Sequence, residues 1–186
     1  MWRGIMDAAA SWTAAGIWIR LVFSLLVGMI IGIDRVMKRR SAGIKTHVLV
    51  CMGSALVMLT SEYLVRTFPD TKSDLTRMGA QVISGVGFLG VGTIMITGRN
   101  QIRGLTTAAC LWICACVGLA AGAGFVEGAF YALILIIVTL KVMSKLDVFV
   151  HERANVFSFY IEFNANRSVA SFLDELRSMA VRISAF

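Results

Sequence analysis

The chain has 186 residues, of which 58% are hydrophobic and 16% are charged, and its mean hydropathy is +0.78. This composition excludes an ordinary soluble domain and indicates an integral membrane protein, because the apolar residues are gathered into long runs. The formal net charge is +7. The basic residues lie beside the apolar runs, so loop topology explains this charge better than nucleic-acid binding does.

The first predicted membrane span covers residues 17–33, about the length that a hydrocarbon core requires. It is followed by a basic segment and has no small-residue cleavage site, so we interpret it as a retained helix and not as a signal peptide. Four residues recur at steps of four along it: Arg20, Ser24, Gly28 and Gly32. This spacing predicts a small-residue face that another helix can approach closely.

The segment DRVMKRRSAGIKTH follows, and it contains five basic residues and one acid. The positive-inside rule therefore places it in the cytoplasm. The second predicted span covers residues 47–64, with Glu62 near its far end. The next loop contains the only proline, Pro69, and its charges are nearly balanced, which fits the outer side.

The third predicted span covers residues 78–96 and carries the most informative pattern. Four polar residues recur there at steps of three and four, which places them on one face of a helix: Asp74, Arg77, Gln81 and Ser84. Asp74 is suited to cap the start of this helix. Polar groups at membrane depth need partners, so we expect this polar stripe to face the other helices of the chain. The glycines that follow predict a helix that is either broken or closely packed: Gly85, Gly87, Gly90 and Gly92.

The segment GRNQIRG returns arginines to the cytoplasmic side. The fourth span begins near Leu105, and small residues at steps of four predict another close-packing face: Cys110, Cys114, Gly118 and Gly122. The turn at 122–124 is short, so the fifth span, residues 125–142, should be an antiparallel neighbour that faces lipid most. Five spans and these basic loops predict an N-terminus outside and a C-terminus in the cytoplasm.

The pattern changes after Glu152. Residues 156–163 are typical of a strand, residues 168–179 of an amphipathic helix, and residues 181–186 of the start of another strand. A β-α-β fragment of about 30 residues is too small to bury a core alone. We therefore divide the chain into a membrane domain, residues 1–150, and a partial cytoplasmic tail, residues 151–186, that docks, dimerises or belongs to a truncated domain.

Four segments in this order resemble the MgtC/SapB family of bacterial inner-membrane proteins: GMIIGIDR, AGIKTHVLVCMGSAL, DLTRMGAQVISGVGFLGVG and IRGLTTAACLWICACVGLAAGAG. The resemblance covers about residues 20–125 and implies an all-α polytopic protein of the inner membrane. The family usually has a glutamate where Asp34 stands and commonly a proline where Leu75 stands. Many members continue into an ACT-like cytoplasmic domain, and the tail resembles part of its first half, as in a shortened or naturally short member.

The resemblance implies a role in growth at low magnesium and, in intracellular pathogens, in virulence through survival inside macrophages. The best-studied relatives act by contacting other membrane proteins, including the ATP synthase, whereas older descriptions call them magnesium transporters. Two functions therefore stay open: a regulator that binds other membrane proteins, and a transporter of magnesium or another cation along the polar stripe. No nucleophile, base and orienting acid can be placed together, so we expect no enzyme and no cofactor other than Mg²⁺.

Charged residues are predicted to gather at both ends of the spans. On the outer side these are Arg20 and Glu62, and Arg20 is expected to pair with Asp74 if the first and third spans touch, or to be solvated at the interface. The inner cluster comprises Asp34, Arg35, Lys45, Thr46, His47 and Arg103. It suits an anion, a lipid headgroup or an acidic partner surface, or it enforces topology only. Asp34 and Asp74 are the candidate magnesium ligands, although both lie near span ends. A homo-oligomer is a further expectation.

Overall fold

The computed structural model describes residues 2–69, 74–96, 102–153, 172 and 178. Its contacts divide the chain into two units, residues 1–144 and 145–186. The predicted β-α-β tail lies outside the described residues, except that Phe172 and Ser178 are helical.

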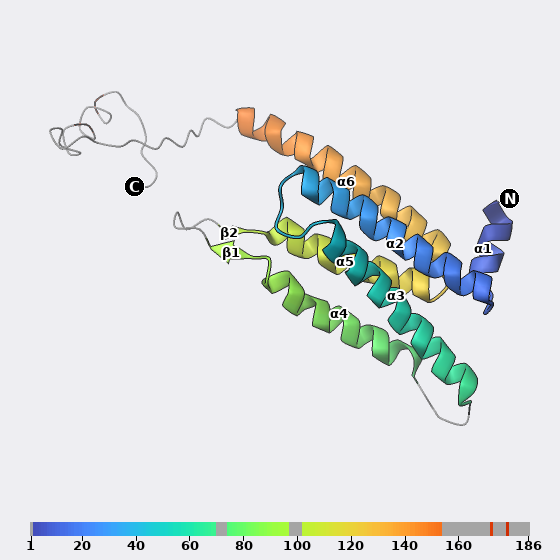
Figure 1. Ribbon diagram of the computed structural model, residues 1–186. Coiled ribbons are helices and arrows are strands. Elements are labelled where there is room, and N and C mark those ends of the chain that lie inside the picture. Colours follow the sequence, from blue (N-terminus) through green and yellow to red (C-terminus); the bar gives the residue numbers. More distant parts are fainter. Residues whose placement is uncertain (1, 70–73, 97–101, 154–171, 173–177, 179–186) are drawn as a thin grey trace. The chain divides into compact units, whose positions relative to one another are not determined.

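The described residues are almost entirely helical (Figure 1). The helices are α1 (Trp2–Ala10), α2 (Ala14–Met37), α3 (Ile44–Thr67), α4 (Leu75–Val91), α5 (Leu105–Gly122) and α6 (Val126–Arg153). Two short strands between α4 and α5, β1 (Met95–Ile96) and β2 (Ile102–Arg103), pair in antiparallel register. Within the described ranges, length and hydropathy mark α2, α3 and α5 as candidate membrane spans. The predicted crossings by α4 and α6 stay predictions.

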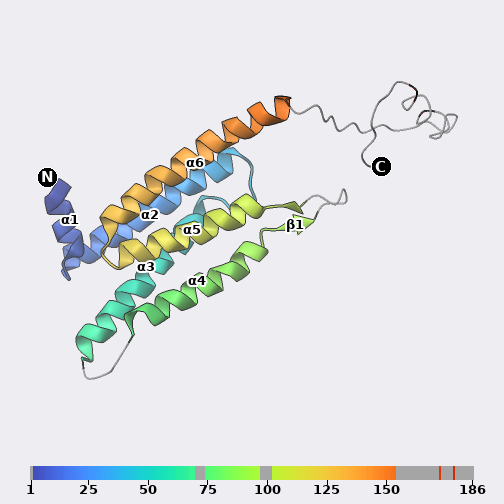
Figure 2. The same cartoon turned by 180° about the vertical axis from the view of Figure 1, so that it is seen from behind.

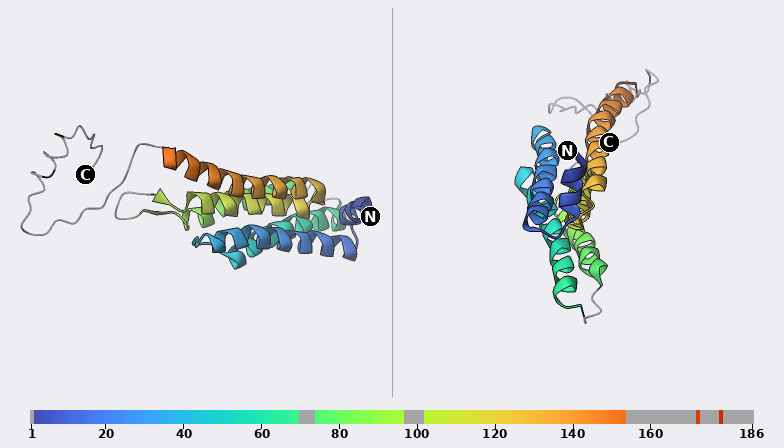
Figure 3. Two further views of the ribbon diagram at one scale, coloured as in Figure 1. Left: turned by 90° about the horizontal axis from the view of Figure 1, so that it is seen from above. Right: turned by 90° about the vertical axis from the view of Figure 1, so that its right-hand side faces the viewer.

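The helix α3 is central to the first unit, because it packs against α2, α4 and α5, and α5 also packs against α2 and α4. The helix α6 joins the core through Ala129 and Leu133, which pack in one cluster with Val27 and Cys114. Figures 1 and 2 show α4 and α6 on opposite sides of the bundle, and Figure 3 shows the long helices running side by side. Among the described residues of the first unit, α4 is packed on the side of α3 and α5.

The small-residue faces of α2 and α5 are close-packing faces, as their four-residue spacing predicts. A Cβ added to Gly28 would lie 2.6 Å from Val48 Cα, and one added to Gly32 would lie 2.6 Å from Ile44 Cα. In α5, a Cβ on Gly118 would collide with the carbonyl oxygen of Cys51. Helix backbones can approach this closely only where side chains are absent.

The helix α4 is continuous through its glycines to Val91. Of the two alternatives that the glycines left open, a helix broken near Gly85 is therefore wrong. A glycine weakens a helix by about 1 kcal/mol relative to alanine. That penalty is smaller than the several kcal/mol that each unpaired backbone group costs in lipid. Asp74 caps the start of α4 as predicted, because its Oδ1 accepts a hydrogen bond of 2.8 Å from the backbone N of Thr76.

Candidate functional site

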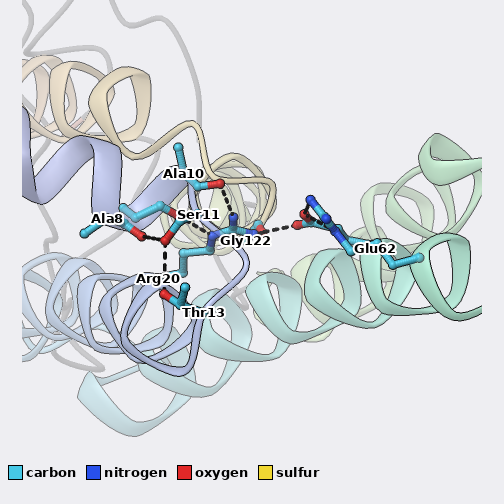
Figure 4. Close-up of polar contacts among 9 residues, drawn as sticks. Ala8, Ala10, Ser11, Thr13, Arg20, Glu62 and Gly122 are labelled. Carbon is cyan, nitrogen blue, oxygen red and sulfur yellow. Dashed lines mark hydrogen bonds and ion pairs between the residues drawn. The ribbon is translucent and has the colours of Figure 1, made fainter.

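A buried arginine near the N-terminal end of α2 joins the ends of several helices (Figure 4). Arg20 is only 1% exposed. Its Nε donates to the carbonyl oxygen of Ala9 at 2.7 Å, its Nη2 to that of Ala10 at 3.2 Å, and its Nη1 to that of Gly122 at 2.9 Å. These carbonyls belong to the last turns of α1 and α5. Carbonyl groups there have no hydrogen-bond partner within the helix, and they carry the negative end of the helix dipole. The guanidinium therefore caps two helices at once.

The charge of this arginine is balanced from α3. Arg20 Nη1 lies 2.7 Å from Glu62 Oε2, and the other carboxylate oxygen, Oε1, accepts from Arg66 Nε at 2.9 Å and from its Nη2 at 2.7 Å. The Arg66 guanidinium also lies 5.3 Å from the ring centroid of Trp12. These three charged residues, Arg20, Glu62 and Arg66, form the outer ion trio, which has one net positive charge.

The expected ion pair between Arg20 and Asp74 is wrong. Glu62 stands beside Arg20 because α2 and α3 pack along each other, whereas α4 packs on α3 and α5. Asp74 is instead exposed, where Thr76 donates to it from both its backbone N and its Oγ1, at 2.8 and 2.7 Å. The hydrogen bond from the Thr76 hydroxyl is the main reason that the pKa of Asp74 lies below its usual value of 3.8.

A hollow adjoins the outer ion trio. It has a volume of about 330 Å³ and is lined by Met58, Glu62, Val65, Arg66, Leu75 and Ala123. Most of this lining is apolar, and Glu62 and Arg66 contribute one carboxylate and one guanidinium to it. The hollow therefore fits an apolar group that ends in a polar one.

At the opposite end of α2, Asp34 holds two basic side chains. Arg35, which is buried, donates from Nε to Asp34 Oδ2 at 3.0 Å, and Lys38 Nζ lies 3.3 Å from Asp34 Oδ1. Lys38 Nζ also donates to the carbonyl oxygen of Leu140 at 3.0 Å and to Ser144 Oγ at 2.9 Å, which ties α2 to α6. The inner-cluster prediction omitted Lys38 and Ser144. The i,i+4 spacing of Asp34 and Lys38 predicts the ion pair between them. No local sequence pattern predicts the hydrogen bond from Lys38 to Ser144, because Lys38 lies at the end of α2 and Ser144 in α6.

The remaining members of the predicted inner cluster do not converge on one site. His47 is fully buried, with its Nδ1 2.8 Å from the carbonyl oxygen of Gly43, and its Nε2 has no partner within the described ranges. Thr46 is exposed and accepts a hydrogen bond from the backbone N of Gly43 at 3.1 Å. Lys45 and Arg103 are also exposed. Successive helical residues differ by about 100° in direction, so Lys45, Thr46 and His47 cannot share one face.

The structure gives no positive support for a metal centre. In the part of the chain that it describes, no three or more His, Cys, Asp or Glu residues are grouped so as to hold a metal ion. The carboxylate of Asp34 contacts Arg35 and Lys38, and that of Asp74 contacts Thr76. Magnesium binding by either residue therefore stays a prediction.

The polar stripe of α4 points away from the bundle. Its members are all exposed: Asp74, Arg77, Gln81 and Ser84. The buried residues of α4 are Gly79, Val86 and Gly90. The expectation that the stripe faces the other helices of the same chain is therefore wrong. The packed face of α4 carries Gly79, Val86 and Gly90, and at 100° per residue the polar stripe lies about 180° away from it.

Two of the α4 glycines also lie outside the packed face. A Cβ on Gly85 or on Gly87 would meet no atom within 4 Å, so their predicted role in packing within the chain is wrong. A Cβ on Gly90 would lie 3.4 Å from Ala108 Cβ, which agrees with the prediction. Gly92 is the C-cap residue of α4 and makes no close interhelical approach.

The register between α4 and α5 gives the level of the polar stripe. A Cβ on Gly79 would lie 3.7 Å from Leu119, and Gly90 adjoins Ala108, so the two helices run antiparallel. Ser84 is then level with the middle of the candidate span α5 (Leu105–Gly122). At a rise of 1.5 Å per residue, Gln81 lies about 5 Å from that level, well inside a hydrocarbon core about 30 Å thick.

The chain is similar to proteins of one known family. The model of the MgtC family matches residues 21–149. The Escherichia coli K12 protein described as "Putative magnesium transporter YhiD" is 40% identical over 134 residues, which are 69% of this chain and 60% of that protein. Protein SapB of Bacillus subtilis is 37% identical over 128 residues, 67% of this chain and 55% of that protein. Protein MgtC of Salmonella typhimurium is 41% identical over 119 residues, 64% of this chain and 48% of that protein.

The chain thus spans between 48 and 60% of the length of these relatives. No solved structure matches it. The family match covers well over half of the 186 residues and includes α3, α4 and α5 completely. Together with the membrane-protein composition and the four sequence motifs, it shows that this chain belongs to the MgtC family.

Proposed function

We propose that this chain is a regulatory protein of the bacterial inner membrane that acts by binding other membrane proteins. The role would be adaptation to low magnesium and, in a pathogen, virulence, with the ATP synthase as one candidate partner. Family membership supports the membrane location, and the description of the Escherichia coli relative YhiD as a putative magnesium transporter supports the link to magnesium. In this proposal α4 and α6 cross the membrane with α2, α3 and α5, which places the N-terminus outside and the C-terminus in the cytoplasm.

The observation that carries the proposal is the exposed polar stripe at the middle level of the bundle. Gln81 and Ser84 are exposed and make no side-chain hydrogen bond within the described ranges. Leaving an amide unpaired in an apolar medium costs roughly 2–7 kcal/mol, depending on the reference state. An interhelical hydrogen bond in the membrane recovers about 0.6–2 kcal/mol. The stripe is therefore more stable against another protein than against lipid tails.

A photo-crosslinking experiment in growing cells tests the proposal. A benzophenone amino acid replaces Ser84 in the full chain, and the control places it at Leu135, which is 65% exposed on α6. We expect crosslinks from position 84 to a defined membrane protein, weakened when Gln81 is changed to leucine, and crosslinks mainly to lipid from position 135. Lipid adducts alone at position 84 would contradict the proposal.

The alternative function is a transporter of magnesium or another cation, which the description of YhiD as a putative magnesium transporter favours. Since the polar stripe is exposed and lines no passage among the described residues, transport along it would have to run between this chain and a second protein. Purified protein in sealed liposomes should then carry Mg²⁺ in a concentration-dependent way, and Gln81→Leu should abolish the flux. Absence of flux in the presence of a co-purifying partner would reject the transporter.

A further inference from the structure

We propose that the polar stripe of α4 is covered by a second copy of this chain, in a dimer whose twofold axis runs along the bilayer normal. This inference rests on the proposed function only in that both place protein against α4. Two copies in one membrane share one orientation, so an axis along the normal brings each residue opposite the same residue at the same depth. The face must therefore be complementary to itself.

The residues nearest the middle level meet that requirement. The Gln81 amide carries both hydrogen-bond donors and an acceptor, and the Ser84 hydroxyl can donate and accept. Each can therefore pair with its own counterpart in the second copy, which a lysine or a glutamate in the same place could not do. Both are exposed and unpaired within the described ranges.

The charged end of the stripe is also complementary to itself. Arg77 would repel its counterpart, but Asp74 carries the opposite charge three residues earlier and about one helical turn away. Arg77 of each copy can thus lie beside Asp74 of the other, so the two pairs carry no net charge. By the register with α5 this end is about 11–16 Å from the middle level, near the membrane boundary, where such pairs are tolerated.

The shape of α4 allows a second copy of this helix to approach closely near Ser84. At 100° per residue, Arg77, Gln81, Ser84, Gly85 and Phe88 lie within a strip about 100° wide. A Cβ on Gly85 would meet nothing within 4 Å, so the backbone is open there. Phe88 is 83% exposed and adds apolar area beside the opening. A second α4 can therefore cross near Ser84 and Gly85 with its aromatic ring beside the contact.

The position of α4 leaves room for this contact. The helix lies on one side of the bundle, away from α6 (Figures 1 and 2), and its opposite face is occupied by α3 and α5. Docking of a second copy thus needs no rearrangement of the first unit.

Disulfide crosslinking of the full chain in membranes tests the dimer. Ser84→Cys keeps Gln81 and places a thiol at the predicted crossing. The controls are the parent chain, whose own cysteines set the background, and Leu135→Cys on exposed α6. We expect an oxidised dimer of twice 20.2 kDa for Ser84→Cys, at least several-fold above both controls. A level equal to that of Leu135→Cys would overturn the inference.

Co-purification of two differently tagged copies gives an independent measurement. Loss of one interhelical amide pair predicts that Gln81→Leu weakens self-association about 3- to 30-fold, whereas Gln81→Asn, which keeps an amide, weakens it less. Leu135→Ala should leave it unchanged. Unchanged self-association of a normally folded Gln81→Leu variant would overturn the inference.

The two proposals fail in different ways. Crosslinks from position 84 to a different membrane protein, without any to a second copy, would reject the dimer and support the proposed function. Crosslinks to lipid alone would reject both.

Discussion

Arg20 and Glu62 form an ion pair between α2 and α3, in which Nη1 lies 2.7 Å from Oε2 while the same guanidinium caps the carbonyl ends of α1 and α5. A buried charge that loses its only counter-charge is strongly destabilising, whereas a satisfied one is not. The residue is therefore a structural junction at the outer end of the bundle.

We expect Arg20→Leu to lower the free energy of unfolding by about 3–5 kcal/mol, because it leaves Glu62 Oε2 and three helix-end carbonyl groups without their buried donor, although Arg66 still contacts Glu62 Oε1. The measurement is unfolding of the full chain in mixed detergent micelles titrated with SDS. The matched control is Arg66→Gln on the same carboxylate, since Arg66 is 52% exposed and an exposed pair contributes about 0–1 kcal/mol. Equal losses of unfolding free energy in the two variants would contradict the role of Arg20 as a structural junction.

Two glycines of similar surroundings in sequence should respond in opposite ways to alanine. Gly118→Ala drives a methyl group into the carbonyl oxygen of Cys51, so we expect a loss of about 1–3 kcal/mol in the free energy of unfolding. Gly87→Ala meets nothing within 4 Å and removes a poor helix former, so stability should be unchanged or higher by up to about 1 kcal/mol. The same SDS titration measures both. A destabilised Gly87→Ala would contradict the exposed position of that residue.

Lys38 should hold the part of α6 near Leu140 and Ser144. Lys38→Met removes the charged donor to both residues, so we expect amide hydrogen exchange after Leu140 to accelerate about fivefold, since a hydrogen bond of this kind at a partly exposed site contributes about 1 kcal/mol. Mass spectrometry of deuterated peptides measures this. Ser144→Ala keeps the contact with the Leu140 carbonyl and should have a smaller effect. Equal protection from amide hydrogen exchange in Lys38→Met and the parent chain would contradict a stabilising contact between Lys38 and α6.

The cap of α4 should make stability depend on pH. The Thr76 hydroxyl holds the pKa of Asp74, outside the helix, below its usual value of 3.8. A carboxyl whose pKa is lower in the folded state stabilises that state above the usual pKa, and this contribution is lost as the pH falls through the folded value. Asp74→Asn keeps a capping oxygen without a titrating charge. The stability difference between the parent chain and Asp74→Asn should therefore be constant from pH 7 to about pH 5 and shrink below about pH 4. A constant difference down to pH 2 would contradict the assignment.

Much of the helix plan follows from the sequence alone. The apolar runs located α2, α3 and α5, because a helix must keep its backbone hydrogen bonds internal in lipid and needs about 20 apolar residues to cross it. The four-residue spacing of Gly28 and Gly32 predicted a close approach, and the structure has one there. The exact ends of α6 were less predictable, since its helical pattern continues well beyond residue 142.

The sequence by itself determined the class of protein, the family, and which residues share a helical face, because composition and periodicity are local properties of the chain. Only the tertiary structure decided which way each face points and which distant residues meet. In α4 both the face with Gly79, Val86 and Gly90 and the polar stripe have a helical period, and packing on α3 and α5 buried the former. Likewise Arg20 met Glu62, 42 residues away, and not Asp74, because a contact between two helices depends on their packing in space and leaves no period in either one.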